Sequence, residues 1–421
     1  MTSTGLTALA GASNVRYNYD ETTTTFNPVL SANNKYAIYR TALGYGELNI
    51  VSSGGDAEGT TWTYANGVIT TTSGTANVLN TVVQTKLDAA NLSIEANKIT
   101  FSASVTGSTS NTFNLLSKTH IVNTNATTIT TQGGNVLLAS NVDDATDNET
   151  TANGYILFGS GLTITTNGGN ITLGGGNVTG TDYALGTSAY PYEGIRIDGT
   201  LNFNSSGGNI TMKGKSYAVN SGSSAWGVGF YVLTTGSINS GTGTVMLDGF
   251  SQSSGSSYSS GLFSNGALTI TSANTTADAI QMIGKSTGTS GEAWGMEAES
   301  ALSLLATGTG GGITVSSSQQ NSGNNYDIVI RGETNMLAKS GPINLLGGQS
   351  GGIANGTILL GGNAYLGSKA SSAVPTSSSN ITIQYDIFNF SNLVFFRVLQ
   401  VFLVVFNHKM CFFCSLLQVI L

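Results

Sequence analysis

Charged residues, proline, cysteine and histidine are all scarce in this chain of 421 residues. Only 9% of the residues are charged, against roughly 25% in an average soluble domain. Proline occurs 4 times, which argues against a proline-rich disordered tract, and glycine does not recur at every third position as collagen requires. The formal net charge is −7 without a basic patch, which argues against a nucleic-acid partner.

Residues that usually carry enzyme chemistry are equally sparse. The only histidines are His120 and His408, and no Ser-His-Asp set, HExxH motif or P-loop is visible. Cys411 and Cys414 form a lone CxxC without the second pair that completes a zinc site. We therefore expect no catalytic activity and no cofactor.

Glycine, threonine, serine, asparagine and aliphatic residues make up most of the chain, a mixture typical of many short strands joined by tight turns. A phrase such as TITTNGGNITL returns every 32 to 39 residues. Each copy has two apolar positions, separated by seven residues in five copies and by nine or ten in the others. These expected core pairs are Ile129 and Val136, Ile164 and Ile171, Phe203 and Ile210, Ile238 and Val245, Ile270 and Ile280, Leu304 and Ile313, and Met336 and Ile343.

A second strand-like run precedes the phrase in most copies. Its first residues are separated by 32 to 34 positions, which is again the repeat length. The runs begin at Gly194, Gly227, Gly261, Gly295 and Asp327. Each repeat thus contains three short strands and one loop rich in serine, glycine and asparagine.

This pattern predicts an all-β fold, a parallel, right-handed β-helix. Each strand has one apolar face that a single repeat cannot bury, and stacking the repeats at about 4.8 Å creates parallel ladders around one column of aliphatic residues. Low-complexity disorder and an antiparallel sandwich are the alternatives. The sustained apolar register argues against disorder.

The expected organisation has three parts. Residues 1–84 form an irregular β-rich segment, residues 85–386 form the solenoid array, and residues 387–421 form an anomalous hydrophobic tail. The tail contains eight of the 16 phenylalanines and no glycine or threonine. It is interpreted as a frameshift product, a membrane anchor or a terminal strand cap, and membrane association is expected only if the tail is genuine.

Three groups of side chains are candidate sites, each with an ordinary structural explanation beside it. Clustered charges on one face of a β-helix could act on acidic polysaccharides, although solvated surface charges are the simpler interpretation. Carboxylates in one loop could hold Ca²⁺, although their spacing fits no defined loop. Aromatic side chains could stack on sugars, or could simply pack in the solenoid. The three groups are, in this order, Arg196, Asp198, Lys213, Lys215 and Asp248; Asp143, Asp144, Asp147 and Glu149; and Trp226, Trp294 and Tyr231.

Residues of about 85–384 resemble the large bacterial surface adhesins of the filamentous-haemagglutinin type. The resemblance rests on LDAANLSIEANKITF, on the passage TITTQGGNVLLASNVDDATDNETTANGYILFG and on GLTITTNGGNITLGGGNVTG. It implies a long β-helical shaft and provides no catalytic residues. The N-terminus MTSTGLTALAGASNV lacks the features of a signal peptide, which favours a fragment of a longer protein.

The sequence therefore predicts a structural and adhesive protein of the bacterial outer surface or the extracellular space. Its expected partners are glycans or proteins of a host or neighbouring cell, bound by the variable loops between copies of the phrase. A polysaccharide-active β-helix enzyme and a membrane-anchored surface protein are the alternatives.

Overall fold

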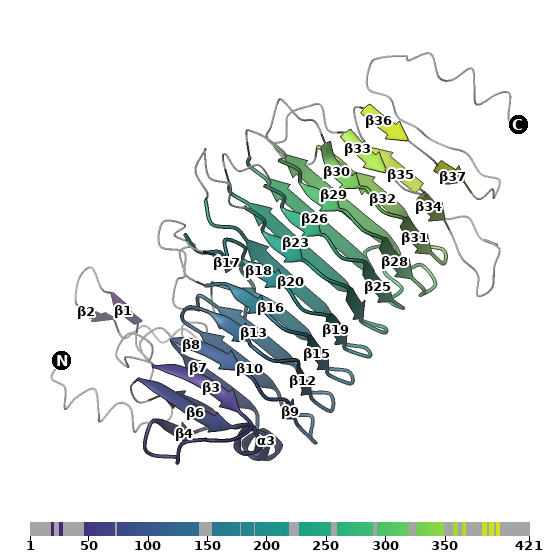
Figure 1. Cartoon of the computed structure of the whole chain (residues 1–421). Coiled ribbons are helices and arrows are strands. Elements are labelled where there is room, and N and C mark those ends of the chain that lie inside the picture. The colour runs from purple at the N-terminus through teal and green to yellow at the C-terminus, as the bar shows by residue number, and fades with distance from the viewer. Residues whose placement is uncertain are drawn as a thin grey trace, which may run out of the picture.

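The computed structural model describes residues 18–20, 25–27, 46–71, 74–142, 154–176, 178–188, 190–218, 227–253, 259–288, 293–319, 326–348, 357–360, 364–367, 381–384, 387–390 and 393–395. Nearly all of the regular secondary structure in these residues is β-strand. The strands form three parallel sheets that wind around one axis (Figure 1). The predicted parallel β-solenoid is confirmed. The candidate Ca²⁺ ligands Asp143, Asp144, Asp147 and Glu149 lie outside the described residues.

The first sheet contains the second strand of each repeated phrase. From the N-terminal end its strands are β4 (Trp62–Ala65), β5 (Val68–Thr71), β7 (Leu92–Ala96), β10 (Phe113–Ser117), β13 (Val136–Ser140), β16 (Ile171–Gly175), β20 (Ile210–Lys215), β23 (Val245–Ser251), β26 (Ile280–Ser286), β29 (Ile313–Gln319), β32 (Ile343–Leu346) and β35 (Ile381–Gln384). The short β17 (Ala184–Leu185) also pairs with β20.

The second sheet contains the run that precedes the phrase. Its strands, in spatial order, are β6 (Thr75–Leu79), β3 (Glu47–Val51), β8 (Lys98–Phe101), β11 (Ile121–Asn123), β14 (Ile156–Phe158), β18 (Ile195–Ile197), β21 (Phe230–Val232), β24 (Leu262–Ser264), β27 (Met296–Ala298), β30 (Tyr326–Ile330), β33 (Thr357–Leu360) and β36 (Ile387–Phe390).

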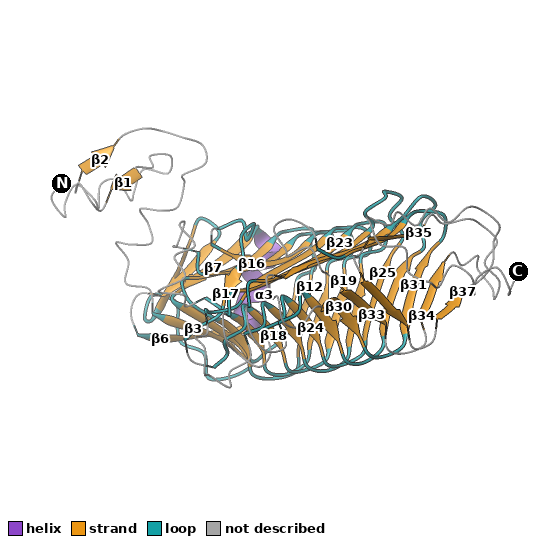
Figure 2. Cartoon of the chain, turned by 90° about the horizontal axis from the view of Figure 1, so that it is seen from above, coloured by secondary structure: helices purple, strands orange, loops and turns teal. Residues whose placement is uncertain are grey.

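The third sheet contains the first strand of each phrase. Its strands are β9 (Val105–Thr106), β12 (Thr127–Thr130), β15 (Leu162–Thr165), β19 (Leu201–Asn204), β22 (Gly236–Asn239), β25 (Leu268–Ser272), β28 (Leu302–Ala306), β31 (Thr334–Ala338), β34 (Ala364–Gly367) and β37 (Leu393–Phe395). Each coil passes through the three sheets in turn, and Figure 2 shows the loops gathered along the edges of the stack.

One repeat is one coil, and equivalent residues stack directly on one another. Ile129 pairs with Ile164, which pairs with Phe203 on the next coil of the third sheet. On the first sheet Val136 pairs with Ile171, and Ile171 pairs with Ile210. All fourteen expected core residues lie in the buried column and are at most 2% exposed. The strands alternate because successive side chains point to opposite faces, so one residue in two enters the core.

The turn between the third and first sheets explains the polar part of the phrase. Asn167 and Gly168 adopt positive φ angles of 52° and 118°, a region that favours asparagine and glycine. A side chain on Gly169 would collide with the backbone of Gly134 in the preceding coil. The Thr166 hydroxyl donates to the carbonyl of Gly169 and is completely buried. These requirements fix Thr-Asn-Gly-Gly at the turn.

An asparagine ladder joins the same turn to its neighbours. The backbone N–H of Asn170 donates to Oδ1 of Asn135 at 2.8 Å, and the N–H of Asn209 donates to Oδ1 of Asn170 at 2.7 Å. Oδ1 of Asn209 then accepts from the N–H of Thr244 at 2.9 Å. Each side chain thus satisfies a backbone group that the ladder of the neighbouring strands does not reach.

The N-terminal end of the core is closed by a helix. α3 (Asn80–Ala89) follows β6 and occupies the position of a third-sheet strand in its coil, next to β9 (Figure 1). Its Val83 and Leu87 are fully buried in the common core. The β4–β5 hairpin is antiparallel and ends the first sheet, so β3, β4, β5 and β6 join the same solenoid. A separate antiparallel pair is formed by β1 (Asn18–Asp20) and β2 (Thr25–Asn27).

Two strands lie at the start of the hydrophobic tail. β36 pairs in parallel with β33, and β37 pairs in parallel with β34. The rest of the tail lies outside the described residues. Within the part of the chain that the structure describes, no helix is long and apolar enough to cross a membrane.

We predict that the core column dominates stability. Ile164→Ala removes a fully buried side chain between Ile129 and Phe203 and should reduce the free energy of unfolding by about 2–5 kcal/mol. Thr163→Ala, on the outward side of the same strand, is the matched control and should change it by less than about 0.5 kcal/mol. Urea denaturation measures both, and equal losses for the two variants would contradict the assigned inward face.

Candidate ligand-binding site

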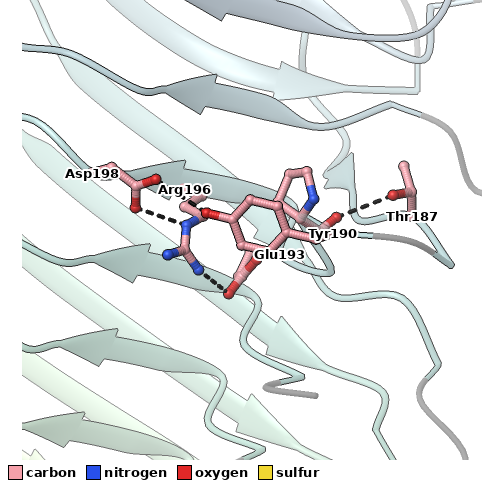
Figure 3. Close-up of polar contacts among 6 residues, drawn as sticks. Thr187, Tyr190, Glu193, Arg196 and Asp198 are labelled. Atoms are coloured by element: carbon pink, nitrogen blue, oxygen red, sulfur yellow. Dashed lines mark hydrogen bonds and ion pairs between the residues drawn. The ribbon is translucent and has the colours of Figure 1, made fainter.

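A group of charged and aromatic side chains lies on the outer face of the second sheet at β18. Ile195 and Ile197 point into the core, so Arg196 between them points outward. Its Nη1 donates to Oε1 of Glu193 at 2.7 Å, and its Nε donates to Oδ1 of Asp198 at 2.7 Å (Figure 3). One guanidinium therefore holds two carboxylates in place, which is the strong, charge-assisted kind of hydrogen bond.

Two tyrosine rings contact the same guanidinium. The Arg196 Cζ lies 4.7 Å from the centre of the Tyr190 ring and 4.8 Å from that of Tyr231. The Tyr190 hydroxyl donates to Oδ2 of Asp198 at 3.2 Å. Tyr231 in turn stacks on Phe263 of the next coil, with 5.1 Å between ring centres and an angle of 3°. Tyr190 is 58% exposed and therefore presents an aromatic surface to solvent.

The loop before β18 supplies both Tyr190 and Glu193. The Thr187 hydroxyl donates to the carbonyl of Pro191 at 3.1 Å and closes this loop beside the tyrosine (Figure 3). Glu193 is only 1% exposed, and its Oε2 accepts no hydrogen bond from the described residues. Burial raises the pKa of the Glu193 carboxyl, although the adjacent Arg196 guanidinium acts in the opposite direction. Burial also raises the pKa of Tyr231 to about 12.

A related group lies on the same face, on later coils. Nε of Arg331 donates to Oε1 of Glu299 at 2.7 Å, and its Nη2 lies 3.5 Å from Oε1 of Glu297. The guanidinium also lies 4.9 Å from the Trp294 ring. Glu297 is completely buried, and the Ser260 hydroxyl donates to its Oε2 at 3.3 Å. Burial raises the pKa of Glu297 to about 9, and the neighbouring Glu299 carboxyl adds to this effect.

The five charged residues that the sequence grouped together lie on two different sheets. Arg196 lies on β18 of the second sheet, and Asp198 directly follows that strand. On the outer face of the first sheet Lys213 is the register partner of Asp248. The group there is extended by two residues from other coils. The Tyr183 hydroxyl donates to Oδ2 of Asp248 at 2.8 Å, and Nζ of Lys285 lies 3.8 Å from Oδ1 of Asp248. Lys215 lies over the Phe250 ring at 5.2 Å.

The aromatic residues considered for sugar stacking pack inside the protein, where the structure describes them. Tyr231 is 1% exposed and Trp294 is 4% exposed, so neither presents a ring face to a sugar. Trp226 lies outside the described residues. Tyr190 has the exposed ring that a stacking ligand requires, and it was not among the residues selected from the sequence.

His120 is also a packing residue. It stacks on Tyr155 of the next coil, with 3.9 Å between ring centres. Burial lowers the pKa of His120 to about 4, with a further contribution from Lys98, so the imidazole is neutral at neutral pH. In the described ranges, no group of three or more histidine, cysteine, aspartate or glutamate side chains is arranged to hold a metal ion.

Some of the site residues that were not selected from the sequence could have been found from the repeat length. Glu299 and Arg331 are 32 residues apart, which is one repeat, so they lie on adjacent coils. Glu193 is three residues before Arg196 in the YPYEGIRID passage. Tyr190 has no such signal, because its contact with Arg196 depends on the path of an irregular loop.

Comparisons with known proteins identify no relative of this chain. No family model matches the chain, and searches of curated proteins and of solved structures find no match.

We predict that Arg196 is required to neutralise Glu193. Arg196→Met leaves the buried carboxylate without its counter-charge, and we expect a loss of about 3 kcal/mol in the free energy of unfolding. Adding Glu193→Gln to that variant should restore much of the loss. Urea denaturation of the two single variants and the double variant measures the coupling, and strictly additive losses would contradict it.

We predict that Glu297 makes the fold less stable as the pH rises. Its pKa is about 9 in the folded chain against an ordinary value of 4.5. The folded chain therefore retains a proton that the unfolded chain releases, and this contribution to stability is complete below about pH 4.5 and is lost as the pH rises through about 9.

The variant Glu297→Gln keeps the side chain neutral at every pH. Its melting temperature should exceed that of the wild type by a margin that increases between about pH 5 and about pH 9. Glu333→Gln, which replaces a carboxylate on the surface, is the control. A margin that stays constant with pH would show that Glu297 is ionised in the folded chain.

Proposed function

We propose that this chain is a segment of the β-helical shaft of a bacterial surface adhesin, located on the outer surface or secreted, and that it mediates attachment without catalysis. The observation that carries the proposal is the continuous in-register stack. The third sheet alone has ten strands, which at about 4.8 Å per coil corresponds to roughly 45 Å of solenoid. A stack of this kind holds its loops at fixed distances from one another.

Two of the connections between sheets in each coil differ in a way that suits this role. The turn between the third and first sheets is short, and buried hydroxyls and the asparagine ladder determine its conformation. The connection between the first and second sheets varies in length, and one such connection contains β17, Tyr190 and Glu193. We infer that the variable connections contact glycans or proteins of other cells, while the short turns preserve the spacing.

Weak contacts repeated along a rod bind collectively. A second contact formed by a rod that is already held is intramolecular, so total affinity rises without a new type of interaction. This mechanism requires no catalytic group and no cofactor. It does require that several coils take part together.

A polysaccharide-active β-helix enzyme is the second candidate, and the group around Arg196 favours it. Glu193 is a buried carboxyl with a raised pKa, and Asp198 is a second carboxyl on the same guanidinium. Two carboxyls held at one site are the pair of groups with which a glycoside hydrolase supplies its acid and its base or nucleophile. Exposed Tyr190 would then be the surface on which a sugar ring lies.

One experiment separates the two candidates. Beads coated with the chain are passed over bacterial and host cells and over immobilised polysaccharides, and both retention and released saccharide are measured. For an adhesin we expect retention that rises steeply with coating density and no released product. Product release that Glu193→Gln abolishes, with Glu333→Gln as the control, would replace the adhesive proposal with the enzymatic one.

A further inference from the structure

The outer face of the third sheet carries a regular array of small polar side chains. Two columns run along the axis, because residues two apart on each strand point outward and their partners on the next coil are in register. From β9 to β25 every outward residue is threonine, asparagine or serine. One column is Thr128, Thr163, Asn202, Ser237 and Thr269, and the other is Thr106, Thr130, Thr165, Asn204, Asn239 and Thr271.

The hydroxyl groups of this array are free to bind something outside the protein. Within the described residues, the hydroxyls of Thr128, Thr130, Thr163 and Thr165 form no hydrogen bond to the protein. No outward position between β9 and β25 holds a charged or aromatic residue. Thr106, Asn202, Ser237, Asn239 and Thr269 are exposed, and the others are partly exposed.

The array is rigid and periodic in two directions. Backbone ladders set about 4.8 Å between coils, and residues two apart on a strand are separated by roughly 6.7 Å. Threonine is β-branched, so a strand leaves it few χ1 rotamers and fixes its methyl and hydroxyl groups. Oδ1 atoms of Asn204 and Asn239 accept backbone N–H groups of their own turns, at 3.2 Å and 3.0 Å, which restricts these side chains too. Little conformational entropy remains to be lost on binding.

The chemistry of this face excludes most kinds of partner. A protein interface is centred on aromatic or arginine side chains, and neither occurs in these two columns. A stacked sugar also needs an aromatic ring, and an anionic membrane or nucleic acid needs basic residues. What remains is a partner that is uncharged, extended and itself periodic.

Ice has these properties. Its surface is a fixed lattice of hydroxyl groups, and on some faces the oxygen rows repeat at distances close to both spacings of the array. Threonine methyl groups can occupy the hollows of that lattice while the hydroxyls replace water positions within it. We propose that the outer face of the third sheet, from β9 to β25, binds ice.

The binding is collective. Each side chain contributes little, and many equivalent contacts act together because the stack holds them in phase. The proposal goes beyond cell attachment and does not depend on it, since the face concerned is the short-turn side of the coil and not the variable connections.

The test uses the full chain and two matched double variants. Thr130→Lys with Thr165→Lys places two lysines on register partners of the third sheet. Thr172→Lys with Thr211→Lys does the same on the first sheet, with equal charge and equal neighbour geometry. Circular dichroism and thermal melting verify that each variant folds. Ice is then grown slowly from a dilute solution of each protein, and the fraction incorporated into the ice is measured, together with thermal hysteresis.

We expect the wild type and the first-sheet variant to be incorporated, and incorporation of the third-sheet variant to fall about tenfold, because two substituted coils divide the contiguous array. Exclusion of the wild type from ice would overturn the proposal, and so would equal incorporation of the two folded variants. If the third-sheet variant does not fold, Thr163→Tyr alone makes the same test. Its full retention in ice would also count against the proposal. Loss of cell attachment in any of these proteins has no bearing on the result.

Discussion

The in-register parallel ladder is the interaction on which the whole structure depends. It places each residue directly beside its equivalent on the next coil, so Ile164 contacts Ile129 and Phe203 and the core is one continuous column. A single strand of two to seven residues has little stability alone. Because every coil buries the face of its neighbours, stability comes from the contacts between coils, as in other repeat proteins.

Because of the same ladder, the backbone groups that need other hydrogen-bond partners lie mainly at the corners of the coil. At the corner between the third and first sheets, backbone groups leave the strand ladder and must find other partners. Buried hydroxyls of Thr166 and Ser205 and the amides of Asn135 and Asn170 provide them. This satisfaction of buried backbone groups explains why the phrase contains threonine, glycine and asparagine in addition to aliphatic residues.

Charge is scarce in the chain, and where it occurs it is locally compensated. Glu193 and Asp198 bind Arg196, and Glu297 and Glu299 contact Arg331. Both groups lie on the outer face of the second sheet, with Tyr231 and Phe263 buried between them. The third-sheet face has no charge over many coils. The solenoid therefore presents chemically different faces although every coil has the same architecture.

The sequence alone determined the parallel solenoid, the repeat length and the fourteen core positions, because alternation within a strand and the spacing between repeats are both periodic and local. Only the tertiary structure decided which polar groups meet. Tyr183 reaches Asp248, which is 65 residues away, and Lys285, which is 102 residues away. The tertiary structure also places the five charged residues that were grouped from the sequence on two different sheets. The irregular connections have no period, so packing against neighbouring coils sets the positions of their side chains.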